Sequence, residues 1–283
     1  MDGVGAGNFG WCPDLPDHRD YSLRNEAVVT LLRRLKIHTR KNAAWPTRVD
    51  WREYCGPIEN QQDLPTSSAH AGVALFQQFE RRSSGRLVMP SRMFVNRTAK
   101  QLAGSASGAN VSLRWVFKAI ARCGLPAERY WRYDPAQLSS EPEAFLYHFQ
   151  RDTRNLRYVR LDSRQMPGQQ MLDQVKSFLS AGFFVALGFP VCTSVGNDAE
   201  IPFPTAADSI VGGQAVTAVG YDDKLRIRSD KGALLIRNSW GPDWGDQGFG
   251  WLPYSYVTER LAVDFWTLLK RSWLRSDEFG RPD

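Results

Sequence analysis

The chain has 283 residues and a formal net charge of +6, with 42% hydrophobic and 23% charged residues. These values are ordinary for a globular protein with a sizeable core, and no apolar run approaches the length that spans a bilayer. The positive charge does not by itself predict nucleic-acid binding, because the basic residues are dispersed and no recognisable nucleic-acid motif is present. Short basic groups occur at Arg33-Arg34, Arg81-Arg82, Arg226 with Arg228, and Lys270-Arg271.

Residues 1–45 are predicted to form a leader and one helix that lie against the folded body. The helix is expected from Asn25 to Lys41, where apolar residues recur at helical spacing. These residues are Val28, Leu31, Leu32 and Leu35. The N-terminus has neither a basic n-region nor an apolar h-region, so we do not expect a secretory signal.

The four cysteines, Cys12, Cys55, Cys123 and Cys192, are scattered and form no disulfide framework. A reducing cytoplasm is therefore the expected location, while passage through a specialised export machine stays open. The sequence has no C-x-x-C pair, no H-E-x-x-H motif, no phosphate-binding glycine loop and no dinucleotide fingerprint. We therefore expect no metal and no cofactor. Asp222-Asp223 follows a predicted strand and is expected to form a turn.

Residues 46–150 are predicted to be mainly helical. One helix is expected from about Thr66 to Arg82, because Pro65 and Thr66 favour a helix start and Ser83-Ser84-Gly85 a stop. A second is expected from Ser112 to Cys123, closed by Gly124.

Residues 151–272 are predicted to be rich in strands, with one helix from Gln169 to Ser180. The tail, 273–283, is polar and is expected to be loosely held. The predicted strands are Leu156–Leu161, Phe183–Val191, Ala215–Tyr221, Ala233–Asn238 and Ala262–Leu269.

Two motifs in the C-terminal half indicate a family. Residues 212–221 spell G-G-Q-A-V-T-A-V-G-Y and residues 237–241 spell R-N-S-W-G. Together they resemble the C-terminal signature of papain-like cysteine peptidases, and further matching segments occur in the same order at 49–52, 60–71, 90–96, 128–134 and 248–257. Residues 10–21 resemble the short leader of bacterial members of that family. The resemblance implies an α+β papain-like fold, in which a helical left subdomain and a β-rich right subdomain enclose a cleft.

The resemblance also assigns candidate site residues. Ser67 falls at the position of the family's nucleophilic cysteine, and Gln214 at the position of its catalytic histidine. Asn238 matches the asparagine that orients the histidine, Gln61 the oxyanion-hole glutamine, and Trp240 the tryptophan that shields the asparagine. A glutamine amide has no proton that titrates near neutral pH, so Gln214 cannot act as a general base.

Another histidine could replace the missing catalytic base only if its ring approached Ser67. His70 lies three residues further along the same predicted helix, a spacing that puts both on one face. We expect His70 instead to be a packed or hydrogen-bonded structural residue beside the apolar stripe of that helix.

With Ser67 at the position of the cysteine and Gln214 at the position of the histidine, three functions are considered. The chain could be a pseudopeptidase that binds an extended peptide or protein partner in its cleft without cutting it, with Gly212 and Gly213 leaving space beside the cleft. It could be a scaffold whose partner surface includes its aromatic ends, although buried aromatic residues commonly pack the core. These ends are Trp11, Phe265-Trp266 and Trp273. It could also retain weak Ser67-dependent peptidase or acyl-transfer activity. The sequence does not indicate the oligomeric state.

Overall fold

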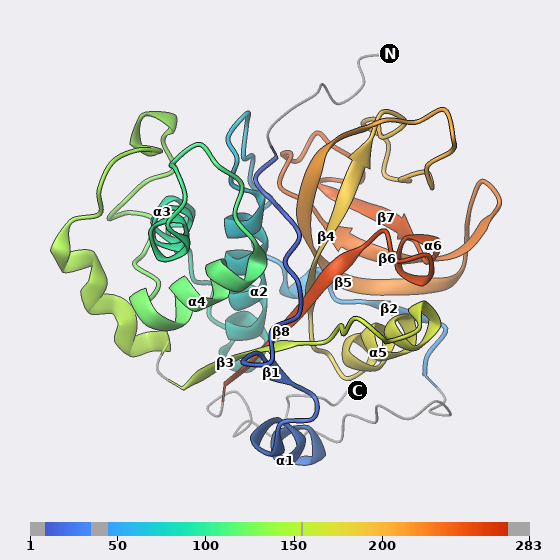
Figure 1. The fold of residues 1–283 in the computed structure, drawn as a ribbon, viewed down its shortest axis with the longest axis horizontal. Helices are drawn as coiled ribbons and strands as arrows, with labels where there is room; N and C mark the ends of the chain where they lie inside the picture. Colours follow the sequence, from blue (N-terminus) through green and yellow to red (C-terminus); the bar gives the residue numbers. More distant parts are fainter. Residues whose placement is uncertain (1–8, 35–44, 154, 271–283) are drawn as a thin grey trace.

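The structure, a computed structural model, describes residues 9–34, 45–153 and 155–270. Helices gather on one side and a twisted sheet on the other, with the longest buried helix between them (Figure 1). The predicted α+β class is confirmed.

The helical half is built around α2 (Ser67–Ser84), which contacts α3 (Arg92–Ala103), α4 (Leu113–Cys123) and strand β5 (Ile210–Ile227). Helix α2 begins after its N-cap Thr66 and ends at Gly85, which adopts the left-handed conformation (φ 68°) that closes many helices. Short 3₁₀ helices occupy Arg52–Tyr54, Pro135–Gln137 and Ala144–Thr153. The predicted helix start at Thr66 and the stop at Gly85 are therefore both confirmed.

The sheet half contains eight strands among the described residues. Their order is β1-β3-β8-β4-β5-β6-β7, with β2 paired to β5, and all pairs are antiparallel except β1 with β3. The strands are β1 (Tyr21–Ser22), β2 (Arg48–Asp50), β3 (Leu156–Arg160), β4 (Val185–Cys192), β5 (Ile210–Ile227), β6 (Asp230–Arg237), β7 (Phe249–Pro253) and β8 (Val263–Lys270). Helices α5 (Gly168–Ser180) and α6 (Ser255–Thr258) contact each other, and α5 also packs on β5.

The N-terminal segment runs between the two halves. In Figure 1 it descends in dark blue from the top of the molecule, passes between α2 and β5, and reaches β1 at the lower edge. Helix α1 (Glu26–Arg34) follows, and its Val28 and Leu32 are buried against the body. The described part of the leader thus lies against the folded body. Residues 35–44, the remainder of the predicted helix, lie outside the described part.

One prediction about the strands is wrong. Asp222-Asp223 does not end a strand, because β5 continues to Ile227. The pairing with β6 shifts register between Asp222 and Arg226, and Asp222 Oδ1 accepts hydrogen bonds from the backbone N–H groups of Lys224 and Leu225. The aspartate therefore shapes an irregularity inside a long strand.

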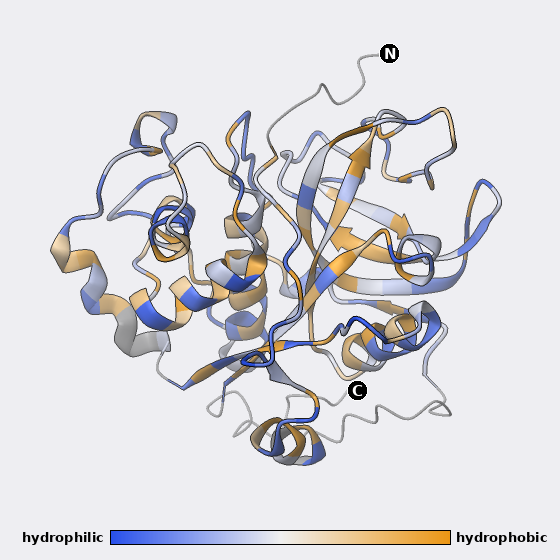
Figure 2. Cartoon of the chain, in the orientation of Figure 1, coloured by the Kyte–Doolittle hydropathy of each residue, from blue (hydrophilic) through white to orange (hydrophobic). Residues whose placement is uncertain are grey.

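The core spans both halves. Helices α4 and α5 carry alternating apolar and polar bands in Figure 2, as expected for helices with one buried face. Trp11, Phe265 and Trp266 are all buried, so packing, and not an exposed partner surface, explains the aromatic ends that the structure describes. Trp273 and the predicted tail, 273–283, lie outside the described residues. No described helix has the length and apolar character needed to cross a membrane.

Candidate functional site

Ser67 lies at the N-terminus of α2 and is completely buried. Its hydroxyl oxygen accepts a hydrogen bond from the backbone N–H of Ala215 at 3.3 Å, across the junction between α2 and β5. This is the only hydrogen bond of that hydroxyl within the described part of the chain. An N–H group cannot take a proton, so the hydroxyl has no base in contact.

Gln214 precedes Ala215 on β5 and is also fully buried. Its Nε2 donates to Asn238 Oδ1 at 2.8 Å and to Gln61 Oε1 at 3.0 Å, and lies 3.3 Å from Ser239 Oγ. Ser239 Oγ donates to Gln61 Oε1 at 2.7 Å. The structure therefore joins three residues singled out from the sequence, Gln61, Gln214 and Asn238, into one amide network.

Ser239 is a member of this network that the sequence interpretation did not single out. It lies between Asn238 and Trp240, within the R-N-S-W-G motif, and its backbone carbonyl also accepts from Gln61 N–H at 2.8 Å. The motif itself was the signal that could have identified it. Ser239 fixes Gln61 through both its side chain and its main chain.

Two N–H donors converge on one backbone oxygen beside Ser67. Gln61 Nε2 donates to the carbonyl oxygen of Phe9 at 2.9 Å, and the backbone N–H of Ser67 donates to the same oxygen at 3.1 Å. A convergent pair of donors of this kind is what an oxyanion hole provides. In this protein the chain's own leader occupies that position.

The next two leader residues fill the rest of the gap between the halves. Gly10 has φ +100°, and a Cβ atom there would lie 2.3 Å from backbone atoms of Pro65 and Thr66. Trp11 is 5% exposed and lies over Gly188 and Gly213, where a Cβ would lie 1.9 Å and 2.8 Å from its ring. Only glycine fits at each of these close approaches.

Hydrogen bonds hold the leader on both sides. The Trp11 N–H donates to Gly213 O at 3.3 Å on β5, and Val111 N–H donates to Gly10 O at 3.1 Å on the helical side. The Trp11 indole Nε1 donates to the buried carboxyl of Asp264 at 3.2 Å. The sequence interpretation did not place Phe9, Gly10 or Asp264 at the site, since no motif marks them. It named Trp11 as part of a possible partner surface, with packing of the core as the alternative.

Trp240 and the two glycines have different surroundings. The Trp240 ring lies 5.7 Å from the Phe9 ring and 5.1 Å from the Trp244 ring, measured between centroids. Gly213 contacts the leader directly, whereas Gly212 is paired with Val191 inside the sheet. Trp240 and Gly213 therefore line the occupied position, and Gly212 supports it from the strand.

His70 does not supply the missing base. Its Nδ1 lies 3.0 Å from the carbonyl oxygen of Thr66, which can only accept, so Nδ1 carries the proton. Its Nε2 has no hydrogen-bond partner among the described residues, and the ring borders a cavity of about 10 Å³ that Asn238 and Ser239 also line. Burial lowers the pKa of His70 to about 3, with a further contribution from the nearby Arg92 charge. The predicted structural role of His70 is confirmed.

The four cysteines offer no substitute nucleophile. All are free, and burial raises the pKa of each thiol. A thiol of raised pKa is mostly protonated at neutral pH and is a poor nucleophile. The described residues also contain no group of three or more His, Cys, Asp or Glu side chains that could hold a metal ion.

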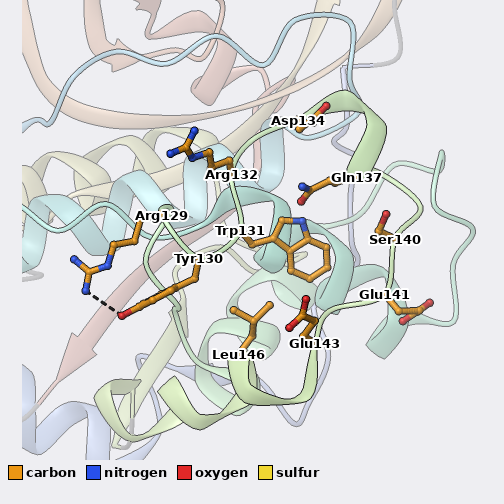
Figure 3. A pocket seen from close by; sticks show the side chains of 10 residues that line it. All are labelled: Arg129, Tyr130, Trp131, Arg132, Asp134, Gln137, Ser140, Glu141, Glu143 and Leu146. Atoms are coloured by element: carbon orange, nitrogen blue, oxygen red, sulfur yellow. Dashed lines mark hydrogen bonds between the residues drawn. The ribbon is translucent and has the colours of Figure 1, made fainter.

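A separate hollow of about 470 Å³ lies on the helical half (Figure 3). Arg129 donates to the Tyr130 hydroxyl at its rim, and Tyr130 is 44% exposed and packs edge-on against Phe145. The lining mixes charges of both signs, including Arg132, Asp134 and Glu141.

Comparison with known proteins identifies the family. Residues 45–259 match the sequence profile described as Papain family cysteine protease. The chain belongs to the papain family of cysteine proteases. It is 30% identical over 213 residues to an uncharacterized peptidase C1-like protein of Acanthamoeba polyphaga mimivirus, a match that covers 72% of this chain and 66% of the viral protein. It is 24% identical over 213 residues to mexicain from Jacaratia mexicana, covering 72% and 87% of the two chains.

Solved structures of papain-family proteins share the fold. Xylellain, a cysteine protease from Xylella fastidiosa, has 28% sequence identity and a TM-score of 0.74, with 95% of this chain and 98% of xylellain covered. The bromelain protease from Ananas comosus has 18% identity and a TM-score of 0.58, with 80% and 100% covered, and this likeness supports the fold alone. The expected papain-like fold is therefore confirmed.

Proposed function

We propose that this papain-family chain is a pseudopeptidase, which uses the fold of the family to bind a peptide or protein segment and does not cut it. The observation that carries the proposal is the environment of the Ser67 hydroxyl. Its hydrogen-bond partner is the N–H of Ala215, and the neighbouring Gln214 uses its amide N–H groups on Gln61 and Asn238.

The chemistry of a serine nucleophile supports this proposal. A serine hydroxyl is a weak acid and needs a positioned base to become nucleophilic. Gln214 cannot take a proton, and the unprotonated Nε2 of His70 forms no hydrogen bond with the Ser67 hydroxyl within the described part of the chain. Asn238 keeps the orienting position, but the group that it orients is an amide. The hydrogen-bonding residues Gln61 and Asn238 are thus retained, whereas the nucleophilic cysteine and the histidine base are not.

The binding part of the proposal rests on the leader. The main chain of residues 9–11 in the leader forms hydrogen bonds with both sides of the gap, which supports a peptide as the class of ligand. A peptide or protein partner is therefore the class of ligand that we propose. The proposal includes a bacterial-type protein in a reducing compartment, as supported by the likeness to xylellain and by the four free cysteines.

Acylation of the intact protein tests the proposal. The protein is incubated with an activated ester such as p-nitrophenyl acetate, and adducts are mapped by mass spectrometry in wild type and Ser67→Ala. We expect no adduct on Ser67. An adduct at Ser67, absent from Ser67→Ala, would instead support the alternative of weak Ser67-dependent acyl transfer.

A further inference from the structure

The cleft contacts three consecutive leader residues in three different ways, which together define a recognition sequence. Phe9 offers a carbonyl oxygen to Gln61 and Ser67 and a ring to Trp240. Gly10 passes so close to the start of α2 that no side chain fits. Trp11 places an indole over Gly188 and Gly213.

Of the three positions, the Trp11 position discriminates most strongly between different side chains. The indole Nε1 donates to Asp264 Oδ2 at 3.2 Å, while Trp266 Nε1 donates to the other carboxyl oxygen at 2.7 Å. Asp264 is fully buried, so an unmatched oxygen there would be costly. A phenylalanine would fill only part of this volume and could not donate to the carboxyl.

The two halves of the protein contact each other without the leader. Thr217 on β5 donates its hydroxyl proton to Ala71 O on α2 at 3.2 Å, and the Ala215–Ser67 hydrogen bond crosses the same junction. The helix and the sheet therefore stay joined if residues 9–11 move out.

The leader is also anchored beyond the cleft. Arg114 pairs with Asp14 and Asp20 at 2.7 Å each, so these contacts tether the leader after it leaves the gap. A tethered segment competes with an added ligand at an effective concentration on the order of mM. Residues 9–11 can thus act as a built-in competitor.

We propose that the cleft recognises a partner segment of sequence aromatic–Gly–Trp, for which Phe9-Gly10-Trp11 is the intramolecular stand-in. This inference rests on the proposed function, since it names the partner of the same cleft. The partner is a peptide segment that adopts the backbone conformation of the leader, with a positive φ at its central glycine. The cleft would recognise its main chain, the lack of a side chain at the central residue and the indole N–H of its tryptophan.

A matched pair of glycine variants tests the proposal in the full chain. Gly10→Ala introduces a methyl group against the backbone of Pro65 and Thr66, whereas Gly85→Ala carries a similar positive φ (+68°) with open space around it. The probe is the labelled peptide acetyl-Asn-Phe-Gly-Trp-Ser-Pro, whose serine replaces the cysteine of the leader. Binding is measured by fluorescence anisotropy.

We expect Gly10→Ala to bind the probe at least about tenfold more tightly than wild type, because the competing leader is displaced. Gly85→Ala should bind as wild type does. A peptide with alanine at the central position should not bind to Gly10→Ala. Equal affinity of wild type and Gly10→Ala, or equal binding of the alanine peptide, would overturn the proposal.

A second variant covers the case in which Gly10→Ala does not fold. Trp11→Ala vacates the indole position without altering the walls of the cleft. The probe peptide should raise its melting temperature, and a peptide with phenylalanine in place of tryptophan should do so much less. Equal shifts with both peptides, or none with either, would contradict the proposal.

Different results would refute the recognition sequence and the proposed function. The bound peptide is recovered after each measurement and its mass determined. A peptide that binds and is cut would refute the pseudopeptidase, whereas a protein that neither binds nor cuts it would refute only the recognition sequence.

Discussion

The carbonyl oxygen of Phe9 lies 3.1 Å from the backbone nitrogen of Ser67, at the point where Gln61 Nε2 also converges. A segment far upstream thereby occupies the position in which an oxyanion would be stabilised. Because both N–H groups donate to this carbonyl, the donors at this position are already engaged by the chain itself.

Restoring both reactive groups should restore a reactive thiol. In the Gly10→Ala background, Ser67→Cys combined with Gln214→His places a thiol at the N-terminus of α2 beside an imidazole. Asn238 Oδ1, which now accepts from Gln214, can accept from that ring. The imidazole and the helix N-terminus should lower the thiol pKa.

Alkylation by iodoacetamide at pH 6 measures this effect. We expect the introduced thiol to react at least about tenfold faster than in the variant with Ser67→Cys and Gly10→Ala alone. The four native cysteines, whose pKa values are raised, provide an internal comparison in the same mass spectra. Equal rates in the two variants would show that Asn238 does not present the ring to the thiol.

Asp264 should make stability depend on pH. Burial raises the pKa of Asp264 to about 7, and the nearby Asp162 charge acts in the same direction, while Arg160 and the indole donors oppose them. An aspartate in an unfolded chain titrates near pH 4. As pH rises from about 4 to 7, the unfolded state releases this proton and the folded state keeps it, so the free energy of unfolding falls.

Urea unfolding at pH 5 and pH 8 tests this expectation. The loss of unfolding free energy between the two conditions should be smaller by about 3 kcal/mol in Asp264→Asn than in wild type. Asp198→Asn, a change at an exposed position, serves as the control and should follow wild type. An identical pH dependence in wild type and Asp264→Asn would contradict the assignment.

His70 should remain neutral in the folded protein between pH 5 and 8. Burial lowers its pKa to about 3, and an unfolded histidine titrates near 6.5. The contribution of His70 to stability is therefore complete above about pH 6.5 and declines as pH falls toward 3. The ring nitrogen resonances, assigned with the help of His70→Gln, should show no titration of this residue between pH 5 and 8. A midpoint near neutral pH would revive His70 as a candidate base.

The sequence predicted those parts of the site that short motifs carry. Gln214, Asn238 and Trp240 lie within two continuous segments, and the helix from Thr66 was marked by local cap and stop residues. These features depend on residues that are close together in the chain, so they can be recognised from the sequence alone.

The occupied cleft could not be predicted in the same way. The contacts of Phe9 and Trp11 are with residues 50 to more than 250 positions away, such as Gln61 and Asp264. They arise only when α2 and β5 are in place. The continuation of β5 past Asp222 has a similar cause, since Arg226 and Ile227 pair again with β6 after the irregularity that Asp222 forms with Lys224 and Leu225.

Hydrolysis of a diverse peptide library by the purified protein at high concentration, beside Ser67→Ala, tests the central claim most directly. Products are identified by mass spectrometry, and Gly10→Ala is included so that the leader does not mask activity. The absence of a base at Ser67 predicts no cleavage above that of Ser67→Ala in either background. Cleavage that disappears when Ser67 is replaced by alanine would show that the protein is a working hydrolase and would contradict the pseudopeptidase.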